Sequence, residues 1–187
     1  MLFRSATYGA AQLCPVFTYA SSSFTTTSTC SNYAVAGASV SNYSASSAAY
    51  QNSASPTSML VQLAALGQSV GSGSFSATDL ILVGEGPAND IATVVTAYLN
   101  FVAYAQSSGA TGSTTDFTNL MSSSGGQTIL GLDSTTIGTK LADTTGAGQY
   151  YLANLYMQRV ATLLVGSIKT NLLTRARSAW PCSTCWT

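Results

Sequence analysis

One stretch of the sequence, residues 79–104, most constrains what this chain can fold into. It begins with the unbroken apolar run Leu80-Ile81-Leu82-Val83, which is followed by a glycine-containing turn. Apolar residues then recur at the spacing of one helix face: Ile91, Val94, Val95, Tyr98, Leu99 and Val102. The stretch therefore predicts a strand covered on both faces by helices, a tight loop ending at an N-cap on Asn89 or Asp90, and an amphipathic helix.

Other segments give weaker patterns. Residues 32–38 are a β-prone run containing Gly37, which predicts a buried strand that leads into a tight loop. Thr57 or Ser58 can cap a helix that carries the leucines up to residue 66, and residues 149–174 have the spacing of a second long helix. Residues 1–30 and 107–148 lack a period, so we expect irregular chain in the first and loops with short helical turns in the second.

The order of these elements predicts a fold class. Strands that alternate with helices are typical of an α/β fold with a mostly parallel sheet. A chain of 187 residues fits a single domain, which we place over residues 1–187. Ligands of such folds bind at the carboxyl ends of the strands, where Gly37 and Asn89 both fall.

The scarcity of charge excludes several classes of function. The chain has six Lys plus Arg, six Asp plus Glu and no histidine, so only 6% of its residues are charged, against roughly 25% in an ordinary domain. A formal net charge of zero provides no excess of positive charge that would attract nucleic acid or anionic membranes. Without histidine, no Ser-His-Asp triad or His-bearing zinc site can be completed within the chain. We expect no cofactor, no metal and no transmembrane segment, because no apolar stretch approaches the roughly 20 residues that a bilayer requires.

The cysteines and the polar composition give information on the cellular location of the protein. Cys14 and Cys30 either close a disulfide or lie as two buried thiols. Abundant Ser, Thr, Gly, Asn and Gln favour a secreted or cell-surface protein, although no secretory signal peptide follows Met1. The first residues therefore suggest a chain that is cut at its front.

Gly37 and Asn89 are the candidate site residues. A backbone N–H at a glycine turn and a side-chain amide can together stabilise a developing oxyanion. The structural alternative is that Gly37 permits a turn with positive φ and that Asn89 caps a helix. Asp79 and Glu85 flank the same strand at opposite ends, which argues against a pair of catalytic carboxylates.

The residues around both positions resemble a known family. Asn32-Tyr33-Ala34-Val35-Ala36-Gly37-Ala38 resembles the second sequence block of the SGNH (GDSL-type) ester hydrolases, and Gly86-Pro87-Ala88-Asn89-Asp90 is similar to their third block, G-x-N-D. The resemblance covers roughly residues 30–175 and implies a three-layer α/β/α sandwich that hydrolyses carboxylic esters with a serine nucleophile. It implies that Gly37 and Asn89 form the oxyanion hole, and that the intact family member acts on a small ester or lipid.

Two departures from the family pattern bear on activity. The chain has no G-D-S block for the nucleophile and, lacking histidine, no D-x-x-H block for the acid and base. We therefore assign no nucleophile. Pro87 also replaces the glycine expected before Asn89 in the third block, which puts the geometry of that loop in question.

The end of the chain differs in residue composition from the rest. Trp180-Pro181-Cys182-Ser183-Thr184-Cys185-Trp186-Thr187 contains a single CxxC, too little for a zinc site without the distant cysteines. Codons for residues 179–187, shifted by two nucleotides, can encode an apolar strand pattern. We therefore expect a frameshift from about Arg175, which would make residues 175–187 a non-native tail. The alternative is a genuine tail with a local disulfide or free thiols.

These observations give two functional hypotheses. The first is a fragment of a secreted SGNH-type esterase or lipase that keeps oxyanion-hole elements, is inactive by itself and tends to self-associate through exposed apolar edges. The second is a non-catalytic secreted or surface module whose Ser- and Tyr-rich loops bind a glycan or a protein.

Overall fold

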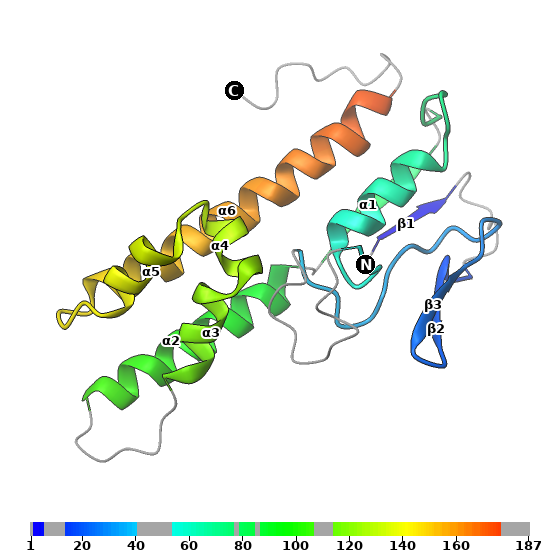
Figure 1. Ribbon diagram of the computed structural model, residues 1–187. Coiled ribbons are helices and arrows are strands. Elements are labelled where there is room, and N and C mark those ends of the chain that lie inside the picture. The colour runs from blue at the N-terminus through cyan, green and yellow to red at the C-terminus, as the bar shows by residue number, and fades with distance from the viewer. Residues whose placement is uncertain are drawn as a thin grey trace.

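One long helix organises the structure, and most of the other helices pack along it (Figure 1). The computed structural model describes residues 2–5, 14–40, 54–76, 79–84, 87–106 and 114–176. The long helix, α6 (Ala147–Asn171), contacts α1 (Met59–Gln68) and α2 (Pro87–Gln106). The shorter α4 (Ser124–Leu130) and α5 (Ser134–Leu141) also pack on α6, and α3 (Thr115–Ser122) packs on α2. A 3-10 turn, η2 (Leu173–Arg175), follows α6.

Burial explains why these helices gather on α6. Fully buried side chains come from every helix of the bundle and include Leu63, Leu66, Val94, Phe117, Met121, Leu130, Ile137, Leu152, Tyr156 and Val160. At the junction with α1, a Cβ built on Gly67 would lie 2.8 Å from the carbonyl oxygen of Asn171, so only glycine allows this approach. The core is therefore built by helix packing.

The described strands form two small sheets. β1 (Leu2–Ser5) pairs antiparallel with β4 (Leu80–Val83), and β2 (Phe17–Ala20) pairs antiparallel with β3 (Ser23–Thr26). Each sheet has two strands. The expected three-layer α/β/α sandwich with a mostly parallel sheet is therefore wrong, because the fold is mainly helical and its described ladders run antiparallel.

Residues 32–38 do not form the expected strand. The Asn32 side-chain oxygen accepts the Ala34 N–H at 3.0 Å, and the Ala38 N–H donates to the Val35 carbonyl at 3.3 Å. Gly37 has φ of +71°, which closes the turn. Local hydrogen bonds of this kind compete with a ladder, and they explain why the apolar run is a turn rather than a strand.

The predicted strand at residues 80–83 is confirmed, but its surroundings differ from the prediction. Leu80, Leu82 and Val83 are exposed, while Ile81 is partly buried. The strand is thus not covered by helices on both faces. An unbroken apolar run does not by itself report how many faces are covered, since the same residue types suit a partly covered two-stranded ladder.

Helix predictions succeeded where capping and periodicity agreed. Ser58 caps α1 as expected, with its side chain accepting the Leu60 N–H at 3.2 Å. The helix predicted after the apolar strand forms, but it begins at Pro87, so neither Asn89 nor Asp90 is the N-cap. Proline suits a first helical position because its missing N–H would have no partner there.

Two regions expected to be mainly irregular hold regular elements. Residues 107–148 contain α3, α4 and α5, and residues 1–30 contain β1, β2 and β3. The hairpin of β2 and β3 turns at Ser21 and Ser22, both with positive φ. The weak apolar patches of the second region become helix faces because α2 and α6 supply the surface that buries them.

A disulfide joins Cys14 to Cys30, which resolves the choice between a bond and buried thiols. Next to it the Val16 N–H donates to the Asn32 carbonyl at 2.7 Å, and the Asn32 N–H donates to the Cys14 carbonyl at 3.2 Å. The bond closes a loop around the β2–β3 hairpin and fixes the residues that lead into the 32–38 turn.

The predicted tail, residues 175–187, lies outside the described residues except for its first two. The Phe75 N–H donates to the Arg175 carbonyl at 2.8 Å, and the Arg175 guanidinium donates to the Gly71 carbonyl at 2.7 Å. These bonds join the end of η2 to the loop that follows α1. Among the described residues, no helix is both long and apolar enough to cross a membrane.

Two exposed carboxylates hold the turns around α5. Asp133 is its N-cap and accepts the Thr136 N–H at 2.7 Å, a bond that lowers the pKa of Asp133. Asp143 accepts the Thr145 N–H at 2.9 Å and the Gly148 N–H at 2.8 Å. Hydrogen bonds from Thr145 are the main cause of the lowered pKa of Asp143.

Acid should destabilise the fold in part through these two groups. Because each folded-state pKa lies below the ordinary value of 3.8, the stabilisation is complete above that value and is lost as pH falls through the folded pKa. The midpoint of thermal unfolding, followed by circular dichroism from neutral pH downward, should fall less steeply in Asp133→Asn/Asp143→Asn than in the parent. An identical acid slope in both proteins would contradict this assignment.

Candidate functional site

The candidate site is a hollow of about 370 Å³ that brings together three distant parts of the chain. The 34–38 turn forms one wall, α1 contributes Met59 and Gln62, and the remaining wall comes from Gly84 after β4 and from Ala88 and Asn89 in the first turn of α2. Both residues that the sequence analysis selected, Gly37 and Asn89, line this hollow. The two are thus neighbours in space, although 51 residues separate Asn89 from the Ala38 carbonyl that it contacts.

Gly37 contributes a backbone donor to the residues that line the hollow. Its φ of +71° is in the left-handed region, and no atom lies within 4 Å of where a Cβ would be. Within the described residues its N–H donates no hydrogen bond, and the turn is closed by the bond from the Ala38 N–H to the Val35 carbonyl. The turn-forming role of Gly37 is therefore real, and it leaves an N–H available to a ligand.

Asn89 offers a side-chain donor in the first turn of α2. Its Nδ2 donates to the Ala38 carbonyl at 2.7 Å, a bond that fixes the amide against the 34–38 turn. An amide nitrogen carries two hydrogens, so one N–H remains beyond this bond. The N-cap alternative for Asn89 is wrong, because α2 begins at Pro87.

Asp90 joins the loop at Val40 to the first turn of α2. Its side chain is fully buried, and Oδ2 accepts the Val40 N–H at 2.6 Å. Its position in the first turn of α2 is also favourable, since a negative charge there lies near the positive end of the helix dipole. Adjacent residues of one helix turn, Asn89 and Asp90, thus bind the same loop at two points.

The start of α1 binds the loop from the other side. The Met59 N–H donates to the Ser39 carbonyl at 2.8 Å, and the Ser39 N–H donates to the Thr57 carbonyl at 3.1 Å. The Ser58 hydroxyl donates to the Val40 carbonyl at 2.9 Å. Residues 38–40 are therefore fixed between two helix N-termini, and the position of Gly37 follows from theirs.

The chemistry available in the hollow is that of neutral donors. None of its described lining residues is charged, and none is serine, threonine or cysteine. Ser58 lies nearby, but it is buried and its hydroxyl is engaged at the cap of α1. The described arrangement can hold a small anion or a polarised carbonyl oxygen, and it supplies neither a nucleophile nor a base.

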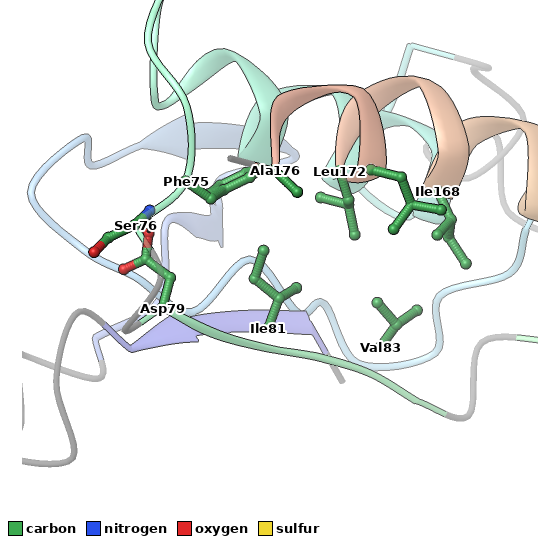
Figure 2. A pocket seen from close by; sticks show the side chains of 9 residues that line it. Phe75, Ser76, Asp79, Ile81, Val83, Ile168, Leu172 and Ala176 are labelled. Carbon is green, nitrogen blue, oxygen red and sulfur yellow. Dashed lines mark hydrogen bonds between the residues drawn. The ribbon is translucent and has the colours of Figure 1, made fainter. Parts of the chain in front are cut away.

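A second hollow of about 180 Å³ lies between β4 and the end of α6 (Figure 2). Ile81 and Val83 face Ile168 and Leu172 across it, so its walls are almost entirely apolar. At one end the Asp79 carboxylate accepts the Ser76 N–H at 2.8 Å. Glu85, the other carboxylate considered beside this strand, lies outside the described residues. This hollow lacks a convergent set of donors, and the first is the better candidate.

Comparisons with known proteins add no assignment. No family model matches the chain, and neither the curated proteins nor the solved structures include a match. Among the described residues, no group of three or more His, Cys, Asp or Glu side chains could hold a metal ion.

Sequence reasoning found the two donors but missed the groups that position them. Asp90 was considered only as a cap, and its partner Val40 has no feature that marks it in the sequence. The available signal was the adjacent Asn-Asp pair after a strand, because one residue can face a hollow while the next is buried. Ser58 was identified correctly as a cap, but its second bond to Val40 was not foreseen.

Removing the Asp90 carboxylate should destabilise the fold around the site. Asp90→Ala leaves the buried Val40 N–H without its acceptor, so the free energy of unfolding should fall by about 2 kcal/mol in urea titrations. Asp116→Ala is the matched control, since Asp116 is an exposed acid in the first turn of α3. Equal losses in the two variants would show that the bond to Val40 contributes nothing specific.

Proposed function

We propose that this chain carries the oxyanion-binding part of a carboxylic ester hydrolase site, with Gly37 and Asn89 as the two donors. The observation that carries the proposal is that both residues line one hollow, and that each keeps an N–H that makes no hydrogen bond among the described residues. Donors fixed in advance suit charge that develops on a carbonyl oxygen, because they need no reorganisation when it appears. The resemblance to the SGNH ester hydrolases in the same residues supports this proposal.

The chain by itself should not turn over esters. It contains no histidine, and the described lining of the hollow contains no nucleophile. In the proposed reaction a hydroxyl oxygen attacks the ester carbonyl, and the negative charge that moves to the carbonyl oxygen is held by the Gly37 N–H and the Asn89 amide. The attacking hydroxyl and the group that accepts its proton would come from outside the described residues.

Binding of a carboxylate tests the donors without requiring turnover. Sodium butyrate should bind in the millimolar range, on the order of 10 mM for so small a ligand. In nitrogen-15 NMR spectra it should shift the backbone amide of Gly37 and the side-chain amide of Asn89. Asn89→Ala should weaken binding about tenfold, because it removes a hydrogen bond to a charged group.

Controls make the test specific to these donors. Asn100→Ala removes an exposed amide from the same helix and should leave the affinity for butyrate unchanged. The amide spectrum of each variant checks that the fold is retained. Butyrate shifts that are confined to other residues, or an unchanged affinity in Asn89→Ala, would reject the proposed role.

We also infer that the native compartment is oxidising, either outside the cell or at its surface. The disulfide between Cys14 and Cys30 supports this inference, since such bonds persist mainly in secreted and cell-surface proteins.

A further part of the proposal is that the chain self-associates through β4. Its exposed leucines, Leu80 and Leu82, lie on a strand with no charged residue, and among the described residues β4 pairs with one neighbour. The chain's net charge of zero offers little repulsion between copies. Sedimentation should show association that rises with concentration and is reduced in Leu82→Lys. A monomer at all concentrations, or an unaffected association in that variant, would contradict this expectation.

A further inference from the structure

The cavity between β4 and the end of α6 shares no described lining residue with the candidate site and differs from it in character. Ile81 and Val83 point from β4 toward α6, and Ile168 and Leu172 point from α6 toward β4 (Figure 2). A cavity of about 180 Å³ remains between these two pairs. An engineered cavity of about 150 Å³ with similar apolar walls stays dry and binds benzene. The size and the walls of this cavity therefore suit a ligand with one aromatic ring.

One wall of the cavity is fixed, and another reaches solvent. Phe75 is buried in the wall, and its N–H donates to the Arg175 carbonyl at 2.8 Å, which joins the loop after α1 to η2. Two other lining side chains are partly in contact with water, since Val83 is 37% exposed and Leu173 is 46% exposed. A ligand can therefore enter between them without unfolding the helices.

Asp79 gives the cavity a single negative charge. It is the one charged residue among the described residues that line the cavity. The Ser76 N–H donates to its carboxylate at 2.8 Å, and the Asp79 N–H donates to the Ser76 carbonyl at 3.0 Å, so the carboxylate is fixed in position (Figure 2). A carboxylate offers about four acceptor positions and can accept a bond from a ligand while it keeps the one from Ser76. A cationic group therefore complements this end of the cavity.

We propose that this cavity binds a small arylalkylamine in its ammonium form, with the aromatic ring between β4 and α6 and the ammonium at the Asp79 carboxylate. Ile81 follows Asp79 by two residues, which is about 7 Å at the rise of a strand. A ring beside Ile81 therefore needs a linker of about two carbons for its ammonium to reach Asp79, as in phenethylamine. The apolar walls bind the ring, and the single carboxylate selects a cation over a neutral or anionic analogue.

Three ligands that share a ring and differ in charge test the proposal. Phenethylamine should bind the full chain with a Kd on the order of 1 mM, and in carbon-13 NMR spectra it should shift the methyl resonances of Ile81, Ile168 and Leu172. Phenethyl alcohol should bind about tenfold more weakly, because its hydroxyl carries no charge that attracts the carboxylate. Phenylacetate, an anion, should leave these methyl resonances unchanged.

A matched pair of variants assigns the selectivity to the carboxylate. Asp79→Asn keeps the size of the side chain and an acceptor for the Ser76 N–H. It should weaken the binding of phenethylamine about tenfold, to the level of phenethyl alcohol, and leave the alcohol unaffected. Asp116→Asn removes an exposed acid of α3 and should leave both affinities unchanged.

A second pair locates the binding in the cavity. Ile168→Phe adds volume between α6 and β4 and should abolish the binding of both phenethylamine and phenethyl alcohol. Val165→Phe makes a similar change at a position of α6 that is 64% exposed, and it should retain the binding of both. The amide spectrum of each variant checks that its fold is retained.

Several outcomes would overturn the proposal. They are methyl resonances that no ligand shifts, equal affinities for the amine and the alcohol, and a preference for the amine that survives Asp79→Asn. If no ligand binds and sedimentation shows that Ile168→Phe removes self-association, the cavity is an interface between copies of the chain, and the proposal is equally rejected. Shifts of Gly37 or Asn89 by phenylacetate would concern the oxyanion donors alone, so the two proposals are tested separately.

Discussion

The bond from the Val40 N–H to the buried Asp90 carboxylate is the constraint on which the site depends. It joins a loop of the N-terminal half to the first turn of α2, and the adjacent Asn89 contacts the same loop at Ala38. Burying a carboxylate is costly unless it accepts hydrogen bonds, so this loop cannot move away without exposing the Asp90 carboxylate or removing the Val40 donor from it. The hollow lined by the two donors therefore depends on the hydrogen bond that the buried Asp90 carboxylate accepts.

The elements that the sequence predicted correctly are those whose signals are local. The cap at Ser58 and the spacing of the leucines after it predict α1 from residues that are close together in the sequence. The spacing of apolar residues around Leu152 and Tyr156 predicts much of α6 in the same way. The helices α3 to α5 were expected only as short helical turns within loops, because Gly, Ser and Thr have weak helix propensity. They form because residues such as Phe117 are buried against neighbouring helices, which no local window reveals.

The sheet prediction failed for a related reason. A run such as residues 80–83 reports that a strand is favourable, but its partner, orientation and coverage depend on distant residues. Gly37 and Asn89 were expected to meet because the ends of parallel strands share an edge. They do meet, but through a turn and a helix N-terminus bound by Asp90, so the proximity was predicted and its cause was not.

The separation of these contacts along the chain has a consequence for the order of folding. The helix pairs α2–α3, α3–α4 and α5–α6 are neighbours in sequence and can pack after closing short loops, whereas the contact between Val40 and Asp90 spans 50 residues. Contacts between distant residues carry a larger entropic cost and form later than local ones. The helical half should therefore assemble first, and the anion-binding hollow should be among the last parts of the molecule to acquire its final shape.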